Sequence, residues 1–256
     1  MTKIATPISH LFKDKAHAER IIAHSGCLEC RDDSLDSVFP GQELFHCDIQ
    51  PIHRLQKKEF DHLKRIKSIK PKLRLITFHI ASCCDKPVLK NMIFNAGGTV
   101  YTEKEMLNNA SENIAKIRNI FGEDIGIAIE NNNYYPTEAY EYVTEPEFIS
   151  KLVNENDIGL LFDIAHARVA SYNKKTAYET YRDALPLSRV KQLHISAYGV
   201  NKNDGIAYDM HEYPKDEDFS EAAYLLKCFD IGYLGVEYYK DTENLIKSLK
   251  EARKLI

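Results

Sequence analysis

Short apolar runs recur along this chain, separated by longer segments in which apolar residues return every three or four positions. Short, nearly continuous apolar runs fit strands that are buried on both faces. The longer segments fit amphipathic helices that bury one stripe of side chains. We therefore expect eight strands, near residues 3–8, 26–31, 43–49, 73–79, 125–130, 158–163, 190–195 and 233–237.

The expected helices alternate with these strands and lie near 12–24, 55–68, 102–121, 145–155, 175–185, 217–229 and 241–254. Thr102 before Glu-Lys-Glu, and Thr144 with Glu147 three residues later, have the pattern of N-terminal helix caps, and Gly122 fits a helix end. Strand and helix alternating eight times in 256 residues predict an α/β protein. The specific expectation is a single (β/α)8 TIM barrel over residues 1–256.

Composition narrows the class of protein further. Hydrophobic residues make up 44% of the chain and charged residues 28%, which suits a globular domain with a sizeable core. No apolar stretch approaches the roughly 18 residues of a membrane span, and the first residues lack a signal-peptide core. We expect a cytoplasmic protein without a membrane partner. A net charge of −4 gives no global field that favours nucleic acid.

Six cysteines in such a chain argue against a disulfide framework. Cys27 and Cys30 match the C-x-x-C pattern, but they lie in an expected strand whose alternation points the two sulfurs to opposite faces. Cys83 and Cys84 follow shortly after a strand end, and we expect them to be wall residues rather than nucleophiles.

Metal-ligand types of residue stand where successive apolar runs end. In a parallel barrel the carboxyl ends of all strands meet at one mouth, so these side chains are expected to converge. The long loops 80–101 and 196–216 follow two of these strands and belong to the same face. The candidate metal ligands are the strand-end and loop residues His46, His79, Glu130, Asp163, His166, His194, Asp209, His211 and Glu237.

Imidazoles mixed with carboxylates, without thiolate, suit iron, manganese, zinc or cobalt rather than calcium or magnesium. Nine ligands exceed the needs of one ion, so a cluster of two or three metals is expected. Glu130 and Glu237 are expected to bridge ions and to be the catalytic residues. The remaining ligands divide into a central group of Asp163 and His194, a second group of His46 and His79, and a third group of His166, Asp209 and His211.

The order of these ligands resembles the xylose-isomerase-like barrel superfamily, which includes sugar isomerases, epimerases and endonuclease IV. Residues 43–240 carry a narrower set of motifs: Glu130-Asn131 with Tyr135, Glu145-Pro-Glu-Phe148-Ile, Gly159-Leu-Leu-Phe-Asp163, Tyr172-Asn173, Leu185-Pro-Leu-Ser-Arg-Val-Lys-Gln-Leu-His194-Ile, Asp209-Met-His211 with Pro214, and Val236-Glu237. This string resembles the family of multinuclear iron enzymes known from methanobactin biosynthesis.

The resemblance implies a cluster of two or three irons and an O₂-dependent remodelling of cysteines in small peptides, often with a partner protein. Manganese, zinc or cobalt are the alternative metals. Two positions depart from the family pattern. His166 stands where many relatives carry Asn, and an imidazole there strengthens the third metal position. Tyr238-Tyr239-Lys240-Asp241 follows Glu237 where many relatives have Glu-Trp-Asp.

Two other functions remain open from the residues. A sugar or polyol isomerase or epimerase needs one divalent metal on Glu130, Asp163, His194 and Glu237, with the two glutamates moving protons. Such an enzyme also favours an Arg soon after His194, but the only basic residue among residues 195–205 is Lys202. An endonuclease IV-like phosphodiester hydrolase needs three metals and basic strand-end loops, and loops 80–101 and 196–216 carry few basic residues. The resemblance implies a small peptide as the substrate, the isomerase alternative implies a small molecule, and nucleic acid is disfavoured.

Overall fold

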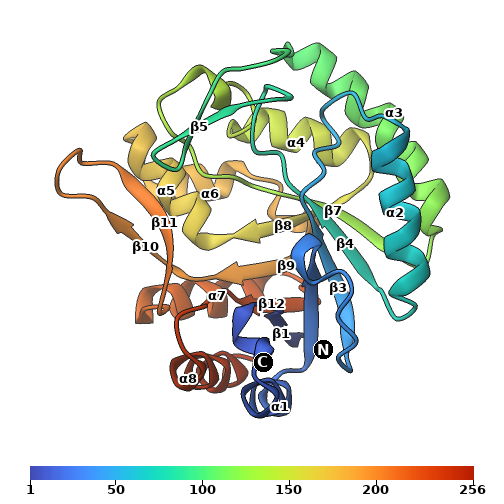
Figure 1. The fold of residues 1–256 in the computed structure, drawn as a ribbon. Helices are drawn as coiled ribbons and strands as arrows, with labels where there is room; N and C mark the ends of the chain where they lie inside the picture. The colour runs from blue at the N-terminus through green and yellow to red at the C-terminus, as the bar shows by residue number, and fades with distance from the viewer.

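A computed structural model describes residues 1–256 and contains a closed barrel of eight parallel strands (Figure 1). Every strand pairs with its neighbours in the sequence of barrel strands, and the barrel closes where Lys3 pairs with Tyr233. The predicted α/β TIM barrel is confirmed. The barrel strands are β1 (Lys3–Pro7), β2 (Cys27–Arg31), β3 (Gln42–Cys47), β4 (Leu75–Phe78), β7 (Gly126–Glu130), β8 (Gly159–Asp163), β9 (Val190–Ile195) and β12 (Tyr233–Val236).

Helices surround the barrel, and the seven predicted ones are present with ends shifted by a few residues. Four 3₁₀ helices join them: η1 (His10–Lys13), η2 (Asp32–Ser34), η3 (Glu138–Tyr140) and η4 (Leu187–Arg189). The α-helices are α1 (Lys15–His24), α2 (Lys57–Ile69), α3 (Glu103–Phe121), α4 (Pro146–Glu155), α5 (Ile164–Lys174), α6 (Tyr178–Ala184), α7 (Asp216–Cys228) and α8 (Thr242–Arg253).

Helix α5 was not predicted, and its burial explains why. Residues Ile164–Ala167 and Val169–Ser171 are all buried, so the helix lacks the polar face on which the periodic pattern depends. The Thr102 cap is confirmed, since its hydroxyl accepts from Glu105 N. The Thr144 cap was wrong: α4 begins after Glu145, and the Thr144 hydroxyl is buried without a partner.

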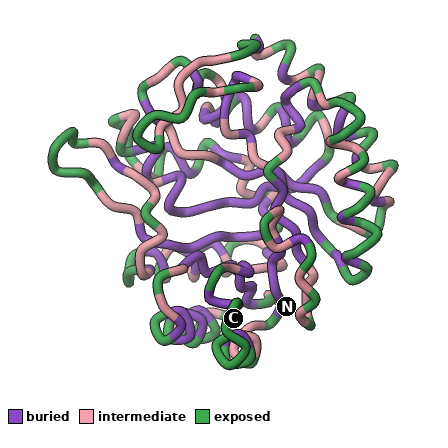
Figure 2. Tube along the Cα trace, viewed as in Figure 1, coloured by how far each residue is buried: buried purple, intermediate pink, exposed green.

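Buried residues follow the barrel strands (Figure 2), and their apolar side chains form two clusters that lie on opposite faces of the strands. A small cluster, defined by Ala5, Cys27, Leu44, Leu75 and Ala128, takes one side chain from each of five barrel strands. A cluster of 59 residues, which includes Cys30, packs the strands against the helices. The predicted separation of Cys27 and Cys30 is confirmed, and all six cysteines are free.

The two long loops each contain an antiparallel hairpin outside the barrel, which was not predicted. Strands β5 (Val88–Lys90) and β6 (Ile93–Asn95) follow β4, and strands β10 (Ala197–Val200) and β11 (Ala207–Glu212) follow β9. Figure 1 shows both hairpins on the same side of the barrel. None of the helices combines the length and the apolar character that a bilayer crossing requires.

Candidate metal centre

The carboxylate of Glu130, at the end of β7, lies between two groups of histidines. Its Oε2 atom is 3.0 Å from His79 Nδ1 and 3.4 Å from His46 Nε2. Its Oε1 atom is 3.6 Å from His194 Nδ1 and 3.6 Å from His166 Nδ1. One carboxylate thus presents each of its oxygens to a different set of imidazoles, which is the geometry of a bridging ligand.

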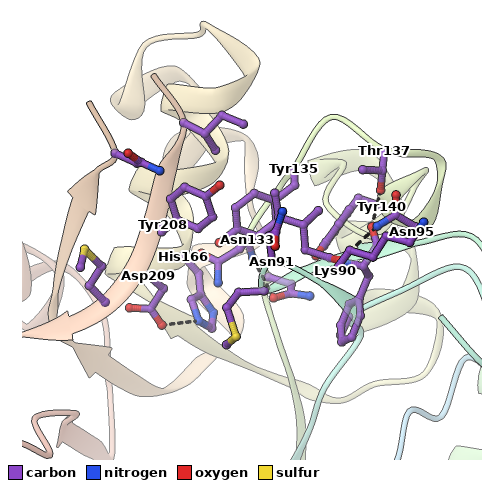
Figure 3. A pocket seen from close by; sticks show the side chains of 18 of the residues that line it. Lys90, Asn91, Asn95, Asn133, Tyr135, Thr137, Tyr140, His166, Tyr208 and Asp209 are labelled. Carbon is purple, nitrogen blue, oxygen red and sulfur yellow. Dashed lines mark hydrogen bonds and ion pairs between the residues drawn. The ribbon is translucent and has the colours of Figure 1, made fainter. Parts of the chain in front are cut away.

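Glu237, just beyond the end of β12, is placed in the same way between the central and the third group. Its Oε1 atom is 3.3 Å from His194 Nδ1, and its Oε2 atom is 3.1 Å from His211 Nε2. Asp209 Oδ2 lies 3.1 Å from His211 Nε2 and 3.3 Å from His166 Nε2, the contact drawn as a dashed line in Figure 3. The three predicted groups therefore form one continuous cluster.

Asp163 completes the central group, and its helix explains its orientation. It caps α5: Oδ1 accepts a hydrogen bond from His166 N at 2.7 Å, which leaves Oδ2 directed at His194 Nδ1, 3.9 Å away. Asp163 and His166 were predicted as metal ligands at the barrel mouth. Both side chains do lie there, but a helix begins between them, and its first turn fixes their spacing.

Asp209 and His211, the predicted metal ligands from the long loop after β9, lie in strand β11. The ladder between β10 and β11 shifts register at this point, because Tyr198 pairs with Asp209 while the preceding Ala197 pairs with Glu212. His211 takes a left-handed φ of 45°, and its side chain contacts both Asp209 and Glu237. The sequence has no turn residue at this point from which the bulge could have been predicted.

The described residues fit metal ions in distance and in donor chemistry. Metal–ligand bonds of about 2.0–2.2 Å place two ligands of one ion roughly 3–3.5 Å apart, close to the separations given above. Buried polar atoms are normally hydrogen-bonded. Yet Glu130 Oε2, Asp163 Oδ2 and His194 Nδ1 are buried without a hydrogen-bond partner, and all three point into the cluster. Metal ions would satisfy all three atoms, with Asp163 Oδ2 and His194 Nδ1 in the central group and Glu130 Oε2 in the second group.

The charge of the site also calls for cations. Five carboxylates with side chains at most 5% exposed surround it, against the single guanidinium of Arg31; they are Glu29, Glu130, Asp163, Asp209 and Glu237. In the metal-free protein, protons supply part of the missing positive charge. Burial alone lowers the pKa of His194, but the negative charges of Glu29 and Glu130 and the hydrogen bond with Glu29 overcome this effect and raise the pKa to about 9. Burial raises the pKa of Asp163 to about 6.

His46 behaves differently. Burial, reinforced by neighbouring His79, lowers its pKa to about 4. Its Nδ1 atom is 2.7 Å from the hydroxyl of Thr77, which leaves Nε2 facing Glu130. The imidazole is therefore neutral and correctly oriented for binding a metal ion.

Sequence analysis missed Glu29 and Arg31, two residues of β2 that face the barrel interior. Glu29 Oε2 is 2.9 Å from His194 Nε2, the ring nitrogen opposite the one that faces Glu130 and Glu237. Arg31 donates to Glu29 Oε1 at 3.2 Å and forms an ion pair with Glu237. Glu29 thereby orients His194, as carboxylates beside metal-binding histidines do. The signal was available: charges alternate with Leu28 and Cys30 inside an apolar strand.

A cleft of about 1340 Å³ opens over the centre between the two hairpins (Figure 3). His79, His166, Asp209 and His211 lie on its floor. Of the nine candidate ligands, only the side chains of His79 and His211 are substantially exposed, at 29% and 34%. The second and third groups are thus the parts of the centre that a molecule in the cleft can reach.

Fold and site together define a TIM barrel with a candidate metal centre at the carboxyl ends of its strands. Solved structures agree on the fold. The 3-keto-D-glucoside 4-epimerase YcjR of E. coli superposes with a TM-score of 0.64 at 13% identity, over 99% of this chain and 100% of that one. A D-allulose 3-epimerase from Methylomonas sp. with bound D-allulose gives 0.61 at 12% identity, over 99% and 96%.

Sequence similarity identifies the family. Residues 49–254 match the RiPP precursor modification enzymes MbnB/TglH/ChrH, and the chain belongs to this family. A UPF0276 protein of Acaryochloris marina is 26% identical over 154 residues, which are 60% of this chain and 54% of that protein. Another from Caulobacter sp. is 28% identical over 109 residues, 42% and 39% of the two chains. The matched region therefore spans about half or less of these relatives.

Proposed function

We propose that this chain is an oxidoreductase with a cluster of two or three irons that modifies a cysteine of a small peptide in an O₂-dependent reaction. One observation carries the proposal: Glu130 and Glu237 each direct their two oxygens at ligands of different groups. A single ion cannot use this arrangement, whereas adjacent ions bridged by carboxylates can. Membership of a family of peptide-modifying enzymes supports the substrate class.

The protein residues have separable tasks in this proposal. Asp163, His194 and the two bridging glutamates hold the buried central position. His46 with His79, and His166 with Asp209 and His211, hold the two positions toward the cleft. Bound iron would supply the redox chemistry with O₂ and coordinate a substrate thiolate. Because His79 and His211 are the exposed ligands, a substrate sulfur would reach the outer positions. The burial of Asp163 and His194 keeps water from the central position.

The lining of the cleft suits an extended peptide. Carboxamides offer both a donor and an acceptor to a peptide backbone, and aromatic rings give apolar contact. The charged lining residues Asp48, Asp204 and Asp209 against Lys90 leave a negative balance that disfavours a phosphodiester. The carboxamides are Gln50, Asn91, Asn95, Asn132, Asn133 and Asn201, and the aromatic residues are Phe94, Tyr135, Tyr140 and Tyr208.

The test begins with metal content per chain, measured by inductively coupled plasma mass spectrometry on protein purified anaerobically without added metal. Two or three irons are expected. His211→Ala is expected to remove one of them, and His17→Ala, an exposed change on α1, is the matched control. Cysteine-containing peptides encoded beside the gene are then incubated with the iron-loaded protein. A mass change that needs both O₂ and the cysteine supports the proposal.

The alternatives predict different results. A single manganese, cobalt or zinc that survives His211→Ala would overturn the multinuclear proposal in favour of a sugar epimerase, whose ligand set is Glu130, Asp163, His194 and Glu237. Three zincs with hydrolysis of a phosphodiester would overturn it in favour of an endonuclease IV-like enzyme. An iron cluster that leaves every cysteine peptide unchanged would overturn the substrate assignment alone.

A further inference from the structure

A second group of potential metal ligands lies outside the barrel mouth. It consists of Asp32 in η2, Cys47 at the end of β3 and His62 in α2. One ligand atom from each residue, a carboxylate oxygen, the sulfur and a ring nitrogen, lies within 4.8 Å of the other two. None of the three belongs to the strand-end centre, and they come from three separate elements.

Strand alternation explains why β3 serves two sites. Successive side chains of a strand point to opposite faces, so His46 faces the barrel interior and Glu130, while Cys47 faces outward toward α2. Cys47 is fully buried. Its sulfur lies near Asp32 of η2 and His62 of α2, in the layer that joins barrel and helices.

The other two ligands are held in place by contacts with each other and with the chain. Asp32 Oδ2 accepts a hydrogen bond from Asp48 N at 2.7 Å. Asp32 Oδ1 lies 2.5 Å from His62 Nε2. The side chains of Asp32 and His62 are 21% and 30% exposed, so the group is closed on the Cys47 side and open to solvent on the other.

A thiolate, an imidazole and a carboxylate are donors that zinc accepts together in a tetrahedral site. Zinc–sulfur bonds of about 2.3 Å and zinc–nitrogen or zinc–oxygen bonds of about 2.0–2.1 Å place the three ligand atoms roughly 3.3–3.7 Å apart. The contact between Asp32 and His62 has to widen by roughly an ångström to admit the ion. Both side chains are partly exposed and can make this movement, and water can fill the fourth position.

We propose that Asp32, Cys47 and His62 bind one divalent cation of the zinc class, at a site separate from the strand-end centre. The ion ties η2 and α2 to the end of β3. That strand end carries His46, and Asp48 follows it with Oδ1 3.7 Å from His79 Nε2. The second site therefore holds in place a segment from which the strand-end centre is built. The proposal is independent of the proposed function.

Cobalt titration tests the proposal directly, because Co²⁺ replaces zinc and a cobalt–thiolate bond gives a near-ultraviolet charge-transfer band. The strand-end centre contains no thiolate, so the band reports the second site alone. Metal-depleted protein is expected to develop the band as Co²⁺ is added to saturation, with the intensity of one cobalt–thiolate site per chain, and to lose it when zinc is added. Cys47→Ser should abolish it, and Cys30→Ser, another buried strand cysteine, should retain it.

Further variants keep the test decisive if Cys47→Ser fails to fold. Asp32→Asn and His62→Gln change partly exposed side chains, and each should weaken cobalt binding at least tenfold. A His194→Ala variant, altered only in the strand-end centre, should keep the band. Absence of the band in the unaltered chain, its survival in Cys47→Ser, or unchanged binding in both partly exposed variants overturns the proposal and leaves an Asp32–His62 hydrogen bond only.

Discussion

Glu29→Gln is the sharpest test of how the strand-end centre is built. Glu29 and His194 are both fully buried, and the carboxylate holds Nε2 of the ring at 2.9 Å while Nδ1 faces the cluster. A buried hydrogen bond to a charged group contributes about 1.5–3 kcal/mol. At roughly 1.4 kcal/mol for each factor of ten, its loss weakens metal binding about 10- to 100-fold. The shape of the side chain is preserved, so the packing of the barrel interior is not disturbed.

Chelator competition measures this change. The metal-depleted variant and the unaltered chain are titrated with Fe²⁺ or Co²⁺ against a chelator of known affinity. Glu43→Gln is the matched control, because Glu43 makes an exposed ion pair with Lys3 at the other end of β3. The argument that Glu29 positions His194 fails if Glu29→Gln and Glu43→Gln both bind metal within twofold of the unaltered chain.

Three further predictions follow from burial, contact and charge. His194 holds a proton at neutral pH in the metal-free protein because its pKa is raised to about 9, and metal binding must displace that proton. Metal affinity should therefore fall by up to about tenfold for each pH unit as the pH is lowered from 9 to 7. Chelator competition across this pH range measures the change. Gly235→Ala should lower metal affinity roughly tenfold, since an added Cβ would lie 2.6 Å from His194 Cδ2, and equal affinities would contradict it. Leu44→Ala should cost about 2–5 kcal/mol in guanidinium unfolding yet leave metal content unchanged, because Leu44 lies in the small interior cluster and contributes no metal ligand.

The sequence predicted the strand-end ligands because one physical rule places them: closure of a parallel barrel brings the carboxyl ends of all strands to one mouth. His46, Glu130 and His194 needed no further information. The rule covers residues at or next to a strand end, and Glu29 was overlooked because it lies further inside its strand. Its position two residues before the end of β2, with Arg31 on the same face, was visible as a charged pair within an apolar strand.

Features that depend on tertiary contacts were beyond prediction from the sequence. The burial of α5 removed the polar face by which helices are recognised. The left-handed backbone of His211 is uncommon for a residue other than glycine, and such strain persists only where the surrounding structure enforces it. The grouping of Asp32 with Cys47 and His62 joins three elements whose contact no local pattern specifies.

The third metal position takes ligands from both the β10–β11 hairpin and the barrel. Asp209 and His211 belong to the hairpin that walls the cleft, whereas every other candidate ligand stands on the barrel itself or on the helix that leaves it. An ion bound by these two residues also restricts the motion of the hairpin, so part of its binding free energy is offset by the lost conformational entropy. Thermodynamic linkage makes this coupling reciprocal, so a molecule that orders the hairpin tightens the ion by the same factor. Metal binding at the third position and ordering of the β10–β11 hairpin are then thermodynamically coupled.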